Sequence, residues 1–541
     1  MKNKYSVLWV MLLLLAAGSS CKKLDLAPTD KYTEKNYWTS EEKANQVVSM
    51  AYSQMVNSTY FFYNNVLSDN AYDGRGDNAG VTSISSGVYD PSLSRLDDEW
   101  RFHYSGIKTC NTLLKYIDNV PNLAEATKNR MIAECLFIRA KHFFNLTTWW
   151  GAVPLFTEDI SIEQSEKITR SSHEDVIKQV IADLDKAESM LPVNTDLTGS
   201  NIGRISKGAA IALKARVYLY DNNWEGVVKE CSKLIGKTDN GTYSLFPSYS
   251  GLFDIANENN SEVILGYGYA PEIRTHDEMI DMVPISQGAR LNALAPTQSL
   301  VDDYLMLSGK DKNASGSGFD PSHPYDNRDP RLTATVVYDG YQWPKADGTT
   351  KTIYIKPGMD PDENAPDEYK PGQVSSPTGY YVRKYYDPTS NNFASGLDLI
   401  VIRYADVLLM YAEAKNEISK LTEADWDQTI KALRARAGFT TAEALNYNGS
   451  WSQADLRTII RRERRVELAL EGTRIFDIRR WKTAQSVLNG YVHGARFGQM
   501  DVDDGYVRVI KRSFDPTRHY LWPVPREERA LNPSLTQNAG W

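Results

Sequence analysis

The chain has 541 residues, of which 42% are hydrophobic and 24% are charged, a balance typical of globular proteins. Its 61 basic and 69 acidic residues are interspersed and give a net charge of −8 at pH 7. Nucleic-acid binding needs a basic face that displaces counterions, so the composition argues against that class of partner. It does not exclude an anionic ligand, because the local field inside a cleft can oppose the net charge.

The first twenty residues have the pattern of an export signal. A basic start at Lys2 and Lys4 and an apolar stretch over residues 5–17, too short to span a bilayer, lead to Gly18-Ser19-Ser20 and Cys21. Lipoprotein signals are cut where a small residue precedes a cysteine. We therefore expect residues 1–20 to be removed and Cys21 to be acylated, which anchors residues 21–541 to a membrane without a span. The alternative is an ordinary signal peptide with Cys21 as a chance thiol.

Three further cysteines, Cys110, Cys135 and Cys231, fall within helix-like patterns. Their odd number gives no disulfide framework. An exported chain of this length does not need one, so we expect all three to be small core residues.

Apolar residues recur at spacings of three and four along several segments, which is the pattern of amphipathic helices. One stripe runs through residues 131–147. Residues 205–236 contain two such patterns separated by the turn Asp221-Asn222-Asn223, and a second pair occupies residues 402–437. These pairs predict antiparallel helices that stack as tetratricopeptide units do.

Several helix starts are marked by a hydroxyl residue followed three positions later by an acidic residue. In this capping pattern the side chains satisfy backbone amides of the first turn. The pattern occurs at Thr39 with Glu42, Ser172 with Asp175, Thr422 with Asp425 and Ser452 with Asp455.

Between about residues 238 and 400 the composition changes to Gly, Pro, Asn, Asp and Tyr, and the segment 356–372 is incompatible with a helix. We expect loops and short strands there, inserted into a helical scaffold over about 30–237 and 400–541. Long irregular segments in a folded chain are usually functional, so the insertion is the expected ligand-facing part.

Four segments, in order, resemble the SusD/RagB family of outer-membrane nutrient-binding lipoproteins. They are residues 21–28 (CKKLDLAP), 139–155 (RAKHFFNLTTWWGAVPL), 462–474 (RERRVELALEGTR) and 521–538 (LWPVPREERALNPSLTQN). The resemblance implies a mainly α fold, in which tetratricopeptide-like helix pairs form a right-handed superhelical scaffold with an irregular insertion that carries short strands. It also implies a location at the outer membrane, facing the cell exterior, and a partner, a SusC-like TonB-dependent transporter over which the lipoprotein sits as a hinged lid.

Within the third segment, Glu463 lies on an otherwise apolar helical stripe with Ile460 and Val466. A carboxylate buried in this way must be paired. We expect Arg474 or Arg479 to be its partner.

No sequence motif for catalysis is present: there is no His-Glu-x-x-His, no Gly-x-Ser-x-Gly, no phosphate-binding loop and no Cys-x-x-Cys. We therefore predict a protein that is not an enzyme and that needs no cofactor. A glycoside hydrolase needs only two facing carboxylates, so that alternative stays open. A structural calcium ion could take oxygen ligands from Asp69, Asp73 and Asp77 or from Asp360, Asp362 and Glu363, unless these are solvated turn carboxylates.

Sugar rings present apolar faces and a rim of hydroxyls, so a glycan site combines aromatic platforms with planar hydrogen-bonding side chains. The loops 69–90 and 266–345 have this mixture. We expect Trp343 and Tyr341 to form a stacking platform with Tyr72 or Tyr89 opposite, and Arg75, Asp77 and Arg290 to bind hydroxyls. The complete predicted site is Tyr72, Asp73, Arg75, Asp77, Asn78, Tyr89, Tyr269, Arg290, Tyr341 and Trp343.

The predicted function is capture of an oligosaccharide or polysaccharide for import. The alternative is capture of peptides, which some members of the resembling family deliver to their transporters. Peptide capture relies on backbone hydrogen bonds in a less aromatic cleft, so the aromatic loops favour a glycan.

Overall fold

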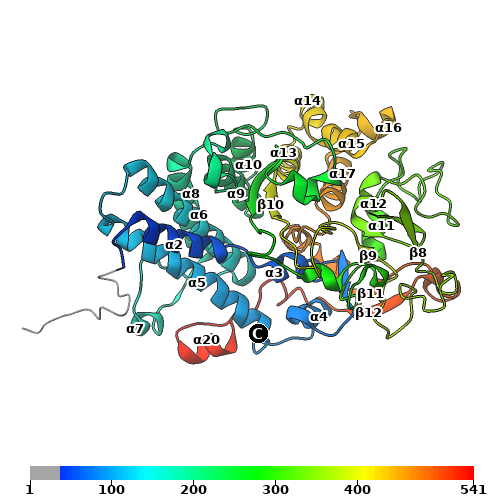
Figure 1. Cartoon of the computed structure of the whole chain (residues 1–541), viewed down its shortest axis with the longest axis horizontal. Helices are drawn as coiled ribbons and strands as arrows, with labels where there is room; N and C mark the ends of the chain where they lie inside the picture. The colour runs from blue at the N-terminus through cyan, green and yellow to red at the C-terminus, as the bar shows by residue number, and fades with distance from the viewer. Residues whose placement is uncertain (1–36, 346) are drawn as a thin grey trace, which may run out of the picture.

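The computed structural model describes residues 37–345 and 347–541, apart from the side chain of Asn78. Cys21 and the predicted signal, residues 1–20, lie outside the described residues. Long helices from residues 41–220 fill the left of Figure 1, and the right side combines further helices with short strands and loops. Among the described residues, no helix is both long and apolar enough to cross a bilayer.

The long helices stack side by side in chain order. Each of these helices packs against the next one, from α5 through α6, α8, α9, α10 and α13 to α17, and α2 covers α5 and α6. Their bounds are α2 Glu41–Ser53, α5 Ser94–Tyr116, α6 Glu125–Trp150, α8 His173–Met190, α9 Lys207–Tyr220, α10 Trp224–Cys231, α13 Tyr404–Glu417 and α17 Gln453–Glu467.

The two helix pairs expected from the sequence are present. α9 and α10 are joined by a turn in which Asn222 has a φ of +56°, and the side chain of Asn223 caps α10. α13 is followed by α14 (Glu423–Trp426), a π-helical turn over Asp427–Lys431 and α15 (Ala432–Ala437). Stacked pairs of this kind bury the apolar face that each helix cannot cover alone.

The predicted caps agree with the structure at three of the four positions. Thr422 and Ser452 form complete capping boxes with Asp425 and Asp455, and Ser172 accepts a hydrogen bond from the amide of Asp175. The fourth prediction is wrong by one residue. Ser40, rather than Thr39, caps α2, because its hydroxyl accepts from the amide of Lys43.

The central helix, α6, is buried on more faces than its single predicted stripe, since Glu134, Arg139 and His142 are also buried. Arg139 is accommodated because its Nε and Nη2 donate to the two carboxylate oxygens of Asp183 on α8, at 2.8 and 2.7 Å. Cys110, Cys135 and Cys231 are free and fully buried, which confirms them as core residues.

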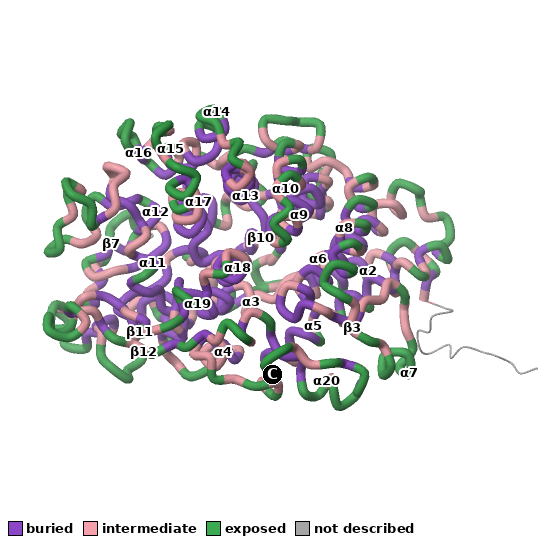
Figure 2. Tube along the Cα trace, turned by 180° about the vertical axis from the view of Figure 1, so that it is seen from behind, coloured by how far each residue is buried: buried purple, intermediate pink, exposed green. Residues whose placement is uncertain are grey.

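Most of the strands lie in or next to the insertion. In the described residues they pair as two-stranded antiparallel sheets, and buried residues run through both halves of the molecule (Figure 2). The pairs are β1 (Ala71–Asp73) with β5 (Leu294–Pro296), β4 (Val263–Tyr267) with β10 (Leu399–Arg403), β6 (Val336–Val337) with β9 (Tyr381–Val382), β7 (Tyr341–Pro344) with β8 (Thr350–Ile353), β2 (Val153–Pro154) with β3 (Arg170–Ser171), and β11 (Gly490–His493) with β12 (Arg508–Arg512).

Shorter helices complete the chain. They are α3 (Ser58–Tyr63), α4 (Val81–Ser86), α7 (Ile162–Ser165), α11 (Gln298–Asp303), α12 (Pro330–Thr335), α16 (Ala442–Leu445), α18 (Arg474–Arg480), α19 (Ala484–Val487) and α20 (Arg526–Leu531).

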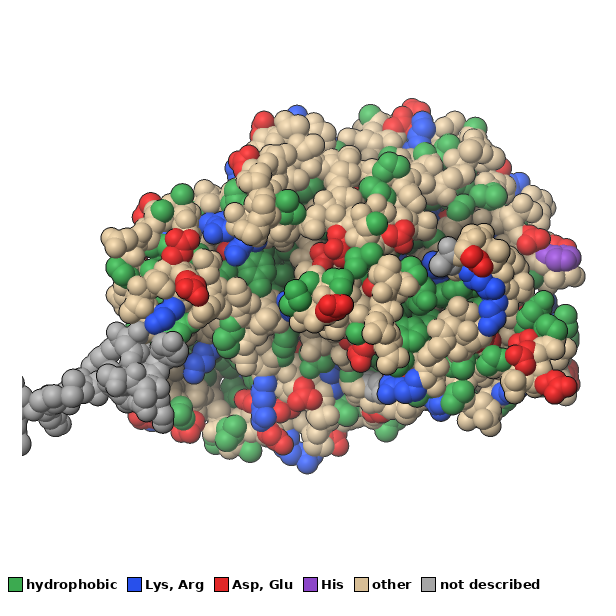
Figure 3. All heavy atoms as spheres, viewed as in Figure 1, with side chains coloured by type: hydrophobic (Ala, Val, Ile, Leu, Met, Phe, Trp, Pro, Cys, Tyr) green, Lys and Arg blue, Asp and Glu red, His purple; other side chains and the backbone are tan. Residues whose placement is uncertain are grey.

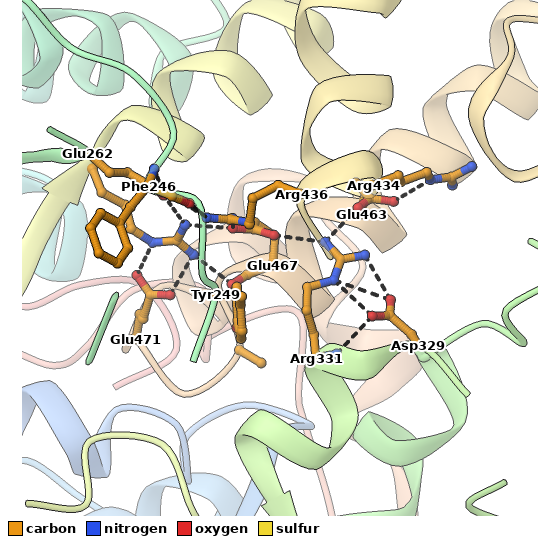
Figure 4. A network of polar contacts seen from close by, with 12 residues as sticks. Phe246, Tyr249, Glu262, Asp329, Arg331, Arg434, Arg436, Glu463, Glu467 and Glu471 are labelled. Atoms are coloured by element: carbon orange, nitrogen blue, oxygen red, sulfur yellow. Dashed lines mark hydrogen bonds and ion pairs between the residues drawn. The ribbon is translucent and has the colours of Figure 1, made fainter. Parts of the chain in front are cut away.

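A buried network of ion pairs joins the insertion to the helical scaffold (Figure 4). It contains equal numbers of acidic and basic side chains: Glu262, Asp329, Glu463, Glu467 and Glu471 with Arg331, Lys384, Arg403, Arg434 and Arg436. Buried charges are tolerated only when they are paired in this way. The network therefore fixes how the two parts of the chain meet.

Glu463 belongs to this network. It is 2% exposed, as expected, but the predicted partners are wrong. Its carboxylate pairs with Arg331 at 2.7 Å and with Arg434 at 2.8 Å. Arg474 instead pairs with Asp69 at 2.8 Å, and Arg479 donates to backbone carbonyls near the C-terminus.

Candidate ligand-binding cleft

A cleft of about 460 Å³ opens between α12, β7 and the segment that follows β9. It combines aromatic rings with polar groups. Its lining residues are Ser250, Phe253, Asp254, Pro330, Thr333, Ala334, Tyr341, Pro344, Arg383, Lys384, Tyr385 and Tyr386. On the face drawn in Figure 3, hydrophobic side chains line hollows between ridges of polar atoms.

Local hydrogen bonding places the polar wall of the cleft. β9 pairs with β6 so that Val382 lies opposite Val336, and the amide of Arg383 donates to the carbonyl of Thr335 at 2.9 Å. Thr335 ends α12, which begins after Asp329 with a proline at its first position, as helices commonly do. The pairing therefore holds Arg383 beside α12.

The aromatic residues form a continuous array behind this wall. Tyr325 stacks on Tyr338 with ring centroids 4.0 Å apart, and edge-to-face or tilted contacts continue through Tyr341 and Trp343 to Tyr386. Burial raises the pKa of Tyr341 and of Tyr386. Of the two, Tyr386 is the half-buried one, and it can offer ring surface to a ligand.

The predicted stacking platform of Tyr341 and Trp343 is not available to a sugar in this structure. The two side chains are 6% and 3% exposed and belong to the core. The physical reason is the alternation of a β-strand: along β7, Tyr341 and Trp343 point inward, whereas Gln342 and Pro344 point to solvent. Tyr341 still contributes to the lining of the cleft.

The early loop is brought against the central insertion, because β1 pairs with β5 and places Tyr72 opposite Ala295. Asp73 accepts from the amide of Arg75 at 2.9 Å. Burial raises the pKa of Tyr63, on which the charges of Asp73 and Arg290 act in opposite directions. Arg290 is largely exposed and forms a two-pronged ion pair with Asp281 at 3.0 and 2.6 Å. Tyr72, Asp73, Arg75 and Arg290 are not among the residues that line the cleft, and Asp73 is fully buried.

The remaining predicted residues lie elsewhere. Asp77 accepts from the amides of Thr82 and Ser83 and thus caps α4. Tyr89 stacks on His519 and contacts Trp541, with ring centroids 5.3 and 4.8 Å away. Tyr269 packs edge-on against Tyr267 and His276. The side chain of Asn78 lies outside the described part of the chain.

Of the residues that line the cleft, sequence reasoning named Tyr341 alone and missed the others, among them Phe253, Arg383, Tyr385 and Tyr386. A signal for the last three exists in residues 380–386 (YYVRKYY), where two basic residues lie between two pairs of tyrosines inside the loop-rich region.

Among the described residues, no three His, Cys, Asp or Glu side chains are grouped so that they could hold a metal ion. Asp69 is engaged by arginines: burial would raise its pKa, but Arg465 and Arg474 lower it. Asp360 and Asp362 accept from amides two residues further along the chain, at 2.9 and 3.0 Å, as turn carboxylates do.

Comparisons with known proteins match almost the whole chain. The family model described as the SusD family matches residues 252–541, and a model described as starch-binding, associating with the outer membrane, matches residues 23–219. A SusD-like protein of Formosa agariphila is 25% identical over 98% of this chain and 97% of its own length. The starch-binding protein SusD of Bacteroides thetaiotaomicron is 23% identical over 38% of this chain and 36% of its own.

Solved structures of SusD-like proteins also superpose on most of the chain. A SusD-like carbohydrate-binding protein from Bacteroides fragilis superposes with a TM-score of 0.83 at 28% identity, covering 92% of this chain and 100% of that one. A laminarin-binding SusD-like protein superposes with a TM-score of 0.68 at 24% identity, covering 93% and 100%. The predicted fold class, a mainly α scaffold of tetratricopeptide-like helix pairs, is confirmed.

Proposed function

Because the chain belongs to the SusD family, we propose that it is a cell-surface lipoprotein that binds an oligosaccharide or polysaccharide, leaves it intact, and delivers it to a SusC-like TonB-dependent transporter of the outer membrane. Glycan binding is a property of this family, and one model that matches the chain describes association with the outer membrane. Acylation of Cys21, with the protein facing the cell exterior, is the anchoring part of the proposal.

The observation that carries glycan binding is the composition of the cleft. Tyr386 offers part of an aromatic ring, while Arg383, Thr333 and Asp254 supply hydrogen-bonding groups at the wall and rim. Rings and planar polar groups together match the apolar faces and hydroxyls of a sugar. A cleft of about 460 Å³ also lies within the size range of small-ligand sites.

The same lining supports binding without catalysis. Glycoside hydrolysis requires two carboxyl groups that face each other across the scissile bond. Asp254 is the one carboxylic acid among the residues that line the cleft. The other charged residues of the lining are Arg383 and Lys384, neither of which can serve as the second carboxylate.

Peptide capture is the second candidate within the family, and calorimetry of the purified protein against polysaccharides and peptides separates the two. We expect saturable binding of a polysaccharide and no shortening of its chain during the measurement. Tyr386→Ala should weaken binding roughly 3- to 10-fold, which corresponds to the loss of one aromatic contact. Tyr447→Ala is the matched control, because Tyr447 is also half-buried but lies against Trp426 and Trp451, away from the cleft. Binding of peptides alone, or cleavage of the polysaccharide, would overturn the proposal.

A further inference from the structure

Two consecutive basic residues beside the cleft have opposite environments. Lys384 is 2% exposed, and its ammonium donates to Glu471 at 2.7 Å, to the carbonyl of Ala469 at 2.8 Å and to the hydroxyl of Tyr249 at 3.0 Å. Its charge is thus neutralised within the buried network. Arg383, directly before it, is half-buried and lines the cleft.

The guanidinium of Arg383 is held by aromatic rings instead of by a carboxylate. It lies 5.0 Å from the ring centroid of Trp343 and 5.3 Å from that of Tyr386. Within residues 37–345 and 347–541, no Asp or Glu comes within the 4.0 Å of an ion pair with it. Cation–π contacts orient a guanidinium without using its in-plane N–H donors; here one donor is directed at the hydroxyl of Tyr341, and the others stay available to a ligand.

In this arrangement the buried Trp343 orients Arg383 and does not stack on a sugar. Its ring and that of Tyr386 both contact the guanidinium, so the donors of Arg383 are oriented before a ligand arrives. A preorganised planar fork is the form in which arginine recognises carboxylate and sulfate groups, by two parallel hydrogen bonds.

We propose that the cleft selects an anionic glycan, one that carries a uronate carboxylate or a sulfate ester, and that Arg383 binds this group directly. The inference rests on the proposed function, because it names the class of glycan. The net charge of −8 does not oppose it, since the local field inside a cleft can differ in sign from the net charge of the chain.

Asp254 is the opposing charge in the same cleft. It is exposed, and it forms no ion pair within the described part of the chain. Its carboxylate repels an anionic ligand and therefore limits affinity. Replacing it with asparagine keeps the shape of the rim and removes only the charge.

Calorimetry with matched glycan pairs tests the inference: a uronate oligosaccharide against its carboxyl-reduced form, and a sulfated oligosaccharide against its desulfated form. For at least one pair, the full chain should bind the anionic member about tenfold or more tightly than the neutral one, with a difference that shrinks in high salt. The pair that shows the difference identifies the anionic group. Arg383→Gln should lower the affinity for the anionic member at least several-fold more than the affinity for the neutral member, while Arg383→Lys should keep part of the difference.

Asp254→Asn should have the opposite effect: the affinity for the anionic member should rise a few-fold relative to the affinity for the neutral member. Thermal melting of Arg383→Gln checks that the variant is folded. Equal binding of both members of each pair, or an equal loss for both in Arg383→Gln, would overturn the inference while leaving glycan capture intact. If only acidic peptides bind, the proposed function and this inference both fail.

Discussion

Arg403 on β10 donates to both carboxylate oxygens of Glu471, with its Nε 2.9 Å from one and its Nη2 2.7 Å from the other. Its Nη1 also donates to Glu262 at 2.7 Å and to Glu467 at 2.6 Å. One guanidinium therefore neutralises parts of three carboxylates, which come from both the insertion and the scaffold.

Replacing Arg403 with methionine should destabilise the fold by roughly 3–5 kcal/mol, because it leaves these carboxylates buried without their shared partner. Urea unfolding followed by circular dichroism measures the change. Lys178→Ala is the control: it removes an exposed ion pair with Glu174 and should cost less than about 1 kcal/mol. Equal effects of the two substitutions would contradict the stabilising role of the network.

Asp406 on α13 gives a pH-dependent contribution to stability. Burial would raise its pKa, but Arg464 and Arg216 hold the pKa below the ordinary value. As the pH falls, the unfolded chain, in which an aspartate has a pKa of about 3.9, therefore binds a proton at Asp406 at a higher pH than the folded chain does. The stabilisation is complete at neutral pH and is lost as pH falls through about 4 and below.

Urea unfolding of the wild type and of Asp406→Asn at pH 7, 5, 4 and 3 tests this titration. The variant should be less stable by roughly 3–5 kcal/mol at pH 7. The difference should narrow at pH 4 and below, because the unfolded wild type takes up a proton at Asp406 while the folded wild type does not, which lowers the stability of the wild type alone. A difference that stays constant with pH would show that the charge of Asp406 is not responsible.

Glu258 should make the fold less stable as the pH rises, the opposite of the effect of Asp406. Burial raises its pKa to about 7, and burial likewise raises the pKa of its neighbour Asp398 to about 6; the amide of Asp398 donates to Glu258 at 2.8 Å. Since the folded chain keeps the Glu258 proton above the pH at which the unfolded chain releases it, stability falls between about pH 4.3 and pH 7.

Glu258→Gln should reduce this loss, so that its melting temperature relative to the wild type is higher at pH 8 than at pH 5. Scanning calorimetry at the two pH values measures the shift. The prediction fails if the variant and the wild type change in parallel. Asp398→Asn should show the same trend over a window that ends nearer pH 6.

Gly106 on α5 lies directly against His142 on α6. A Cβ at this position would lie 2.1 Å from the Nε2 of His142, a fully buried side chain. Gly106→Ala should therefore destabilise the fold by roughly 1–3 kcal/mol, the cost of overpacking. Gly449→Ala is the matched control, since nothing lies within 4 Å of its added methyl group. Thermal melting of both variants compares a crowded site with an open one.

The scaffold could be predicted from sequence because its signals are local. Helical periodicity gave α6, α9, α10 and α13, and side chains such as Thr422 and Ser452 mark helix starts through contacts within one turn. The error at α2 has the same local origin, since Thr39 and Ser40 are adjacent hydroxyl residues and spacing alone does not choose between them.

Contacts between distant segments could not be predicted in this way. The helical spacing of apolar residues around Glu463 predicted correctly that it is buried. Its partner Arg331, however, lies 132 positions earlier in the chain, on α12. The cleft has the same limitation: Arg383 faces it only because β9 pairs with β6. The inward direction of Trp343, by contrast, was available from the alternation along β7.

Lys384 belongs to the buried charge network, and its neighbour Arg383 lines the cleft, which affects the free energy of ligand binding. Lys384 is immobilised among buried ion pairs, so the backbone that carries Arg383 and Tyr385 is already ordered when the chain has folded. The conformational entropy of arranging this wall is then lost during folding and not during association, which leaves more of each favourable contact to appear as affinity.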